Sequence, residues 1–153
     1  MIFLGIDPGT VRVGYGVIEK NGGTYKYKES GLLKIENKEQ KSRLLKIEEE
    51  LEKIIKRIKP DKAGVEKIFF SKNKKTAIKV AEARGVIIST LHKNNIDLIE
   101  LSPTQIKLSV AGNGRSSKEA VAKMVNYFLN INTNKLIDDE TDAIAIAIAA
   151  GDY

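Results

Sequence analysis

The chain has 153 residues, a length that suits one domain with a sizeable core, and 42% of them are apolar while 30% are charged. It contains no cysteine, which excludes disulfides and a thiolate site. It also shows neither a membrane-spanning apolar run nor a secretory leader pattern. We therefore expect a cytoplasmic protein with a single domain over residues 1–153. Lysine and arginine total 26 against 20 aspartates and glutamates, and the resulting net charge of +6 favours an anionic partner such as nucleic acid.

The first part of the chain predicts three strands that meander antiparallel to one another. The expected strands run from Ile2 to Asp7, from Val11 to Glu19 and from Tyr25 to Ile35. Asn21-Gly22-Gly23 lies between the second and the third strand, and such residues favour the tight turn of a hairpin.

The middle of the chain alternates helices with strands. Apolar residues recur at helical spacing from Lys38 to Lys59, and Pro60 ends this helix. A short buried strand is expected at Lys62–Glu66, a long helix at Lys74–Lys93, and another strand at Ile96–Leu101.

The last part of the chain is predicted to be helical. Ser102 caps a short helix with Pro103 at its first position, and the serine pair at 116–117 caps a helix that runs to about Leu129. The final helix is expected over Asp139–Ala150. Its AIAIAIA run alternates with period two, as a strand would, but alanine favours a helix and the acidic start suits a helix N-terminus.

These elements predict an α/β fold with a mixed five-stranded sheet, an antiparallel meander plus parallel strands, flanked by helices. Asp7 and Glu66 each end a strand of this sheet, and Asp139 and Asp142 are three residues apart on one face of the last helix. In open α/β sheets, ligand sites form where strands end.

Four carboxylates that converge would repel one another unless a cation neutralised them. Mg²⁺ and Mn²⁺ prefer oxygen ligands. Two such ions about 4 Å apart are a recurrent arrangement for in-line phosphodiester hydrolysis. The pattern therefore indicates a metal-dependent site for phosphodiester chemistry.

Each acid also has an ordinary explanation, which the sequence leaves open. Asp7 opens the turn Asp-Pro-Gly-Thr, in which aspartate and proline are both favoured. Glu66 could pair with Lys67, and Asp139 and Asp142 could serve the helix N-terminus. The metal hypothesis requires all four acids to meet.

Four blocks of the sequence, in this order, resemble RuvC-type Holliday-junction resolvases. They are GIDPGTVRVGYG, VEKIFFSKNKKTAIKVAEARG, SPTQIKLSVAGNGRSSKEAV and DDETDAIAIAIA, and together they span nearly the whole chain. The resemblance implies an RNase H-like fold, a homodimer, and Mg²⁺-dependent paired nicking of four-way DNA junctions in recombination and repair, with two ions per site and Mn²⁺ as a substitute. It also implies a branch-migration helicase as a partner.

The catalytic and metal-binding residues that the resemblance implies are Asp7, Glu66, Asp139 and Asp142, and some members of the family carry histidine at the position of Asp139. Phe69 matches an aromatic residue that members place against bases at the junction centre, with Phe70 beside it as the alternative ring. Asn113 stands where some members have a basic residue. The implied DNA-binding residues are Phe69, Phe70, Lys72, Lys74, Lys75, Lys107, Arg115 and Lys118. The helix around Ala77–Leu91 fits the symmetric dimer contact of the family.

Three other functions fit parts of the sequence. DPGT followed by GYG also resembles the phosphate loop of sugar kinases and actin-like ATPases, but those proteins need two such domains. RuvC-like nucleases that process ribosomal RNA share the acidic site, although the AEARG and GNGRSSKEAV blocks argue against them. A DNA-binding module without catalysis is the third alternative, and the retention of all four acids argues against it.

Overall fold

Five strands form one mixed sheet in the order β3-β2-β1-β4-β5. The structure, a computed structural model, describes residues 1–9, 11–35, 39–68 and 74–153. β1 pairs antiparallel with β2, and β2 with β3, whereas β4 is parallel to β1 and β5 is parallel to β4. The strands are β1 (Ile2–Pro8), β2 (Val13–Asn21), β3 (Thr24–Leu32), β4 (Lys62–Glu66) and β5 (Asp97–Leu101). The predicted meander and the predicted parallel strands are both confirmed.

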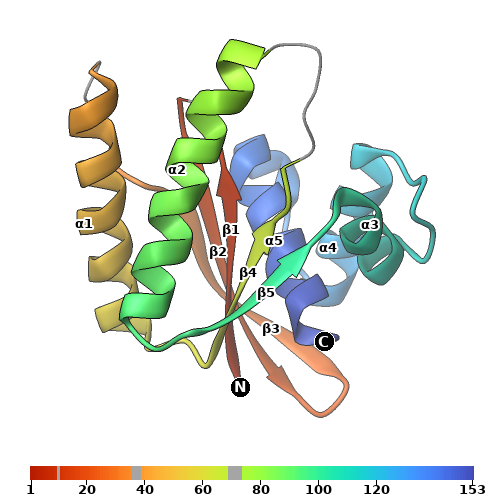
Figure 1. The fold of residues 1–153 in the computed structure, drawn as a ribbon. Coiled ribbons are helices and arrows are strands. Elements are labelled where there is room, and N and C mark those ends of the chain that lie inside the picture. Colours follow the sequence, from red (N-terminus) through yellow and green to blue (C-terminus); the bar gives the residue numbers. More distant parts are fainter. Residues whose placement is uncertain (10, 36–38, 69–73) are drawn as a thin grey trace.

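Helices cover both faces of the sheet (Figure 1). On one face lie α1 (Gln40–Ile58) and α2 (Lys74–Lys93). On the other face α5 (Asp138–Gly151) packs against β1 and β2, and the helices α3 (Pro103–Ala111) and α4 (Lys118–Leu129) cover it from outside. A short 3₁₀ turn, η1 (Thr133–Lys135), leads into α5. Every helix in the described ranges is too short or too polar to cross a membrane.

A few predicted element ends are wrong. β2 begins at Val13 rather than Val11, whose side chain points into solvent with 69% of the residue exposed. β3 ends at Leu32 rather than at residue 35, and α5 starts one residue early, at Asp138. The predicted start of the first helix, at residue 38, lies outside the described residues.

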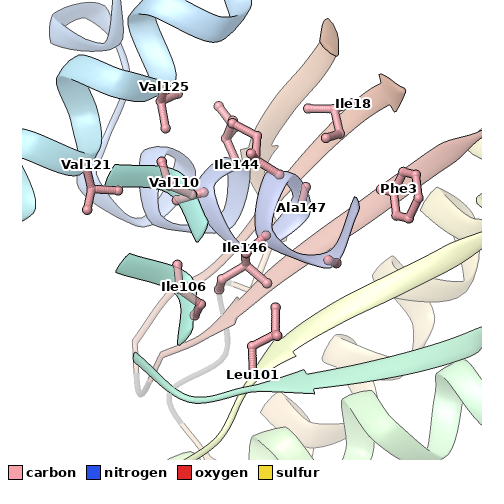
Figure 2. Close-up of a cluster of buried hydrophobic side chains, with 14 of the residues drawn as sticks. Phe3, Ile18, Leu101, Ile106, Val110, Val121, Val125, Ile144, Ile146 and Ala147 are labelled. Carbon is pink, nitrogen blue, oxygen red and sulfur yellow. The ribbon is translucent and has the colours of Figure 1, made fainter. Parts of the chain in front are cut away.

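The helix α5 forms the centre of one hydrophobic cluster, which explains its ambiguous sequence pattern. Its residues from Ala143 to Ala150 are all buried. Figure 2 shows Ile144 and Ile146 of this helix among side chains of α3, α4 and the sheet, which include Val110, Val125 and Phe3. Because a helix buried on all sides presents no polar face, its apolar residues need not follow a period of 3.6.

Candidate active site

Asp7 and Glu66 lie at the ends of neighbouring parallel strands. Ile6 of β1 is in register with Val65 of β4, so the next residue on each strand, Asp7 and Glu66, emerges at the same edge of the sheet. Arg84 of α2 fixes the end of β4, since its Nε donates a hydrogen bond to the backbone carbonyl of Glu66 at 3.0 Å. The sheet thus brings two of the four predicted acids together.

Glycines in the sheet bring the start of α5 to the same edge. A Cβ atom on Gly14 would lie 2.1 Å from the carbonyl oxygen of Asp139, and a Cβ on Gly5 would lie 2.0 Å from that of Ala143. Gly14 is the cross-strand partner of Asp7, so the first turn of α5 rests directly beside Asp7. The sequence contained a signal for this packing, because glycine inside a strand pattern often marks a close backbone approach.

The four acids act on one another electrostatically. Burial, together with the negative charges of Asp142, Glu66 and Asp139, raises the pKa of Asp7 to about 7. Burial and the charge of Asp142 also raise the pKa of Glu66, while Lys118 and Lys107 oppose that rise. Asp7 therefore lies within electrostatic reach of Glu66, Asp139 and Asp142.

Two cationic side chains partly compensate this negative charge. Nζ of Lys118, the first residue of α4, donates a hydrogen bond to Oδ2 of Asp142 at 2.7 Å. This bond raises the pKa of Lys118, so the ammonium group stays charged. Nε of Arg12 lies 3.0 Å from Oδ2 of Asp139. Sequence reasoning assigned no role to Arg12, because nothing in the local pattern pairs it with a residue so distant in the chain.

Oδ2 of Asp139 is left without a hydrogen bond. The Arg12 contact meets the distance of an ion pair but not the alignment of a hydrogen bond, and this buried oxygen has no other partner among the described residues. A buried carboxylate oxygen without a hydrogen-bond donor is costly, and a cation can remove that cost.

The donor set fits a hard divalent cation. All four candidate ligands are carboxylates, two of them carry raised pKa values, and one presents an orphaned buried oxygen. Among the described residues, no three acidic or histidine side chains stand in finished ligand geometry. This arrangement is expected of like charges that repel one another, with Arg12 and Lys118 drawing Asp139 and Asp142 toward themselves.

Two cavities flank the acids and share Lys118 and Asp142 as lining residues. The first has a volume of about 240 Å³; Glu66 and Lys107 also line it, above an apolar floor that includes Ile106 and Val121. The second has a volume of about 360 Å³ and is lined by polar groups of η1 and of the start of α5. Asp142 is therefore accessible to a ligand from both cavities, and Glu66 from the first.

The predicted DNA-binding residues fall into three groups. Lys107 and Lys118 line the first cavity beside the acids. Arg115 is exposed in the loop before α4, where its backbone N–H donates to Oδ1 of Asn113 at 2.9 Å. The rest cannot be placed: Phe69, Phe70 and Lys72 lie outside the described residues, and Lys74 and Lys75 belong to the first turn of α2 but their side chains are not described.

Comparison with known proteins gives consistent matches along the chain. The family described as "Crossover junction endodeoxyribonuclease RuvC" matches residues 3–150. A protein of that name from Brachyspira hyodysenteriae is 50% identical over 150 residues, covering 97% of this chain and 92% of the relative. Another from Petrotoga mobilis is 42% identical over 154 residues, covering 100% of this chain and 94% of the relative.

Solved structures give the same result. "T. thermophilus RuvC in complex with Holliday junction substrate" superimposes with a TM-score of 0.91 at 29% identity, covering 99% of this chain and 93% of that one. The Fowlpox virus resolvase, also solved with Holliday junction DNA, has a TM-score of 0.62 at 16% identity and shares the fold.

Proposed function

The chain belongs to the RuvC family of crossover junction endodeoxyribonucleases, and we propose that it cuts four-way DNA junctions at the site formed by Asp7, Glu66, Asp139 and Asp142. As a member of this family it is a Holliday-junction-resolving endonuclease that hydrolyses phosphodiester bonds with the help of a divalent metal. The observation that carries the assignment of the site is that carboxylates from three elements surround Asp7, whose pKa is raised to about 7 by burial and by the negative charges of the other three acids. The matches favour neither RNA processing nor ATP binding.

The proposed ligands of the metal are the same four acids, and the proposed ion is Mg²⁺, with two ions per site and Mn²⁺ as a substitute. When bound, such ions supply charge neutralisation and an activated water for phosphodiester hydrolysis. Burial and the charges of the other three acids all raise the pKa of Asp7, which suits it to a central position among the ligands. Arg84 keeps Glu66 in place through its backbone carbonyl.

The DNA strand is proposed to enter across Lys107 and Lys118. Both side chains line the cavity that contains Glu66 and Asp142, and both lower the pKa of Glu66, so their charges reach the acids. Lysines can neutralise backbone phosphates at this position without reading the base sequence. The remaining proposed contacts are Phe69, Phe70, Lys72, Lys74, Lys75 and Arg115, which rest on the resemblance alone.

A homodimer is proposed through the outer face of α2. Ile87 and Leu91 of this helix are buried in the protein, whereas 56% of Ile78 is exposed. Ala81, Gly85 and Ser89 continue the exposed side at helical spacing, and small residues let two helices approach closely. A two-fold dimer would present two sites to a four-way junction, which suits two symmetric cuts.

Three further proposals complete the assignment. Residues 1–153 form one nuclease domain, because both hydrophobic clusters lie against the same sheet. The protein is proposed to act in the cytoplasm, and a branch-migration helicase is its proposed partner, as the family resemblance implies.

The function is tested by a nicking assay on a four-way junction with each strand labelled in turn. Wild-type protein with Mg²⁺ should give paired nicks at symmetric positions, and neither a linear duplex nor an EDTA-treated reaction should give product. Equal cutting of the linear duplex, or cutting in EDTA, would contradict the proposal.

A further inference from the structure

Each acid of α5 in the site is paired with a cation from another element. Lys118 holds Asp142 through an aligned hydrogen bond of 2.7 Å. Arg12, between β1 and β2, holds Asp139 through a contact of 3.0 Å that is not aligned as a hydrogen bond. The two pairs differ in quality, and the Arg12 pair is the looser one.

The Arg12–Asp139 ion pair should contribute little to folding stability and should be easily replaced by another cation. The Arg12 side chain is 55% exposed while that of Asp139 is 25% exposed, and ion pairs with one partner in solvent contribute little to stability. Oδ2 of Asp139 is buried and lacks a hydrogen-bond donor, so a divalent cation would satisfy it better than the guanidinium does. The guanidinium, once released, has a fork of donors that matches a phosphate.

We propose that Arg12 is an exchangeable counter-ion: a divalent cation displaces it from Asp139, and the freed guanidinium then binds a backbone phosphate of the DNA. This inference rests on the proposed function, because it takes Asp139 as a metal ligand. Under this proposal the metal binds Asp139 and the DNA phosphate binds Arg12, so each ligand breaks the same ion pair. Metal binding should therefore strengthen DNA binding, and DNA binding should strengthen metal binding by the same factor.

The chain offers a matched control pair away from the site. Arg57 of α1 pairs with Glu29 of β3, with side-chain exposures of 53% and 30%, close to the 55% and 25% of the Arg12–Asp139 pair. Arg57→Gln therefore removes the same charge from a similarly exposed ion pair, one that is hydrogen-bonded at both guanidinium nitrogens, without touching the acids. Any difference between Arg12→Gln and Arg57→Gln reports the local effect of the guanidinium.

The first experiment is a calorimetric titration of Ca²⁺ into the protein without DNA. Loss of a competing surface ion pair should make Arg12→Gln bind Ca²⁺ about 1.5- to 5-fold more tightly than Arg57→Gln does. Arg12→Lys, which keeps the charge, should bind like wild type. In an Asp139→Asn background, adding Arg12→Gln should change the affinity no further. Equal Ca²⁺ affinities for Arg12→Gln and Arg57→Gln would overturn the proposal.

The second experiment measures junction affinity against salt concentration, with and without Ca²⁺, on junctions verified as uncut. With Ca²⁺, Arg12→Gln should flatten the log–log slope by about one unit, because one phosphate contact is lost. Without Ca²⁺ the slope of Arg12→Gln should match that of wild type, because in the wild-type protein Asp139 still holds Arg12 away from the DNA. A slope that changes equally in both conditions, or in neither, would overturn the proposal. Failure of the proposed function would instead show in the wild-type nicking assay with Mg²⁺.

Discussion

The two ends of α5 treat negative charge in opposite ways. At its start, Asp139 and Asp142 face Asp7 across a crowded site, and burial with mutual repulsion raises the pKa of Asp7 to about 7. Just past its end, burial of Asp152 is outweighed by hydrogen bonds from Ser109, Tyr25 and Lys20, which hold the pKa of that carboxyl below its usual value.

The contrast separates the start of α5, which carries the proposed catalytic acids, from its end, which anchors the helix to the rest of the fold. The donors on Asp152 tie the end of α5 to β2, β3 and α3, so the helix is anchored where no chemistry takes place. The anchored helix can then press its first turn against Gly14, and keep carboxylates together that would otherwise move apart. Natural proteins commonly concentrate such local conflict at functional sites.

The largest expected effect is on the nicking rate, and it comes from removing the charge of Asp7, which faces the start of α5. Asp7→Asn should lower the nicking rate by about 10²–10³-fold or more, because a ligand and its preorganised charge are lost together. Junction affinity without metal should hold or rise slightly, since a negative charge facing phosphates disappears. Gel shift and nicking on the same folded protein make the test. Cutting at the wild-type rate would reduce Asp7 to a turn residue.

The second effect comes from pushing α5 off the sheet. A Cβ on Gly14 would meet the carbonyl oxygen of Asp139 at 2.1 Å, so Gly14→Ala should destabilise the fold by about 1–3 kcal/mol or more and also abolish nicking. The matched control is Gly23→Ala in the hairpin, where nothing lies within 4 Å of the added methyl group. Urea unfolding compares the two. A Gly14 variant as stable as the Gly23 variant would show that the close approach is absent.

The third effect belongs to the anchored end. Asp152→Asn should destabilise the protein by about 1–3 kcal/mol, because hydrogen bonds to a charged acceptor are weakened. Nicking by the folded fraction should stay near the wild-type rate. Asp97→Asn, at an exposed position, serves as the control for loss of one negative charge. If Asp152→Asn left stability unchanged but slowed nicking, the division between the two ends of α5 would fail.

The smallest effect concerns a single lysine beside the acids. Lys107→Ala should flatten the salt dependence of junction binding by about one log–log unit, as expected for one released counterion. Lys123→Ala is the control, since Lys123 is exposed on α4 and lines neither cavity. Identical slopes for the two variants would remove Lys107 from the proposed DNA path.

Local patterns were enough to predict the order of elements. They also placed Asp7 and Glu66 at the ends of apolar strands and Asp139 and Asp142 on one helix face. The spacing left an ordinary role open for each acid, and the metal-binding role came from the family resemblance. The buried alanine–isoleucine run was harder, because a helix enclosed on all sides has no polar face to mark its period.

Contacts between distant segments were not predictable in the same way. Arg12 meets Asp139, and Arg84 meets the carbonyl of Glu66, only because the sheet and helices bring these residues together. Gly14 was predicted to lie within a strand, and its lack of a side chain is what lets α5 reach Asp7. A glycine in a strand can indicate a close backbone approach, but only the packing of the fold shows that α5 is the segment that approaches.

The most direct test of this account is the stability of metal-free Asp7→Asn and Asp152→Asn proteins across pH. Because the fold raises the pKa of Asp7 from 3.8 to about 7, the contribution of this group to stability is fully present below about pH 4 and is lost as the pH rises through 7. Asp7→Asn should therefore be more stable than wild type at about pH 8 in EDTA, with the advantage vanishing in acid. Asp152→Asn should be less stable than wild type at about pH 8, because its lowered pKa has the opposite consequence. An Asp7→Asn protein no more stable than wild type at that pH would contradict the claim that the start of α5 holds unsatisfied charge.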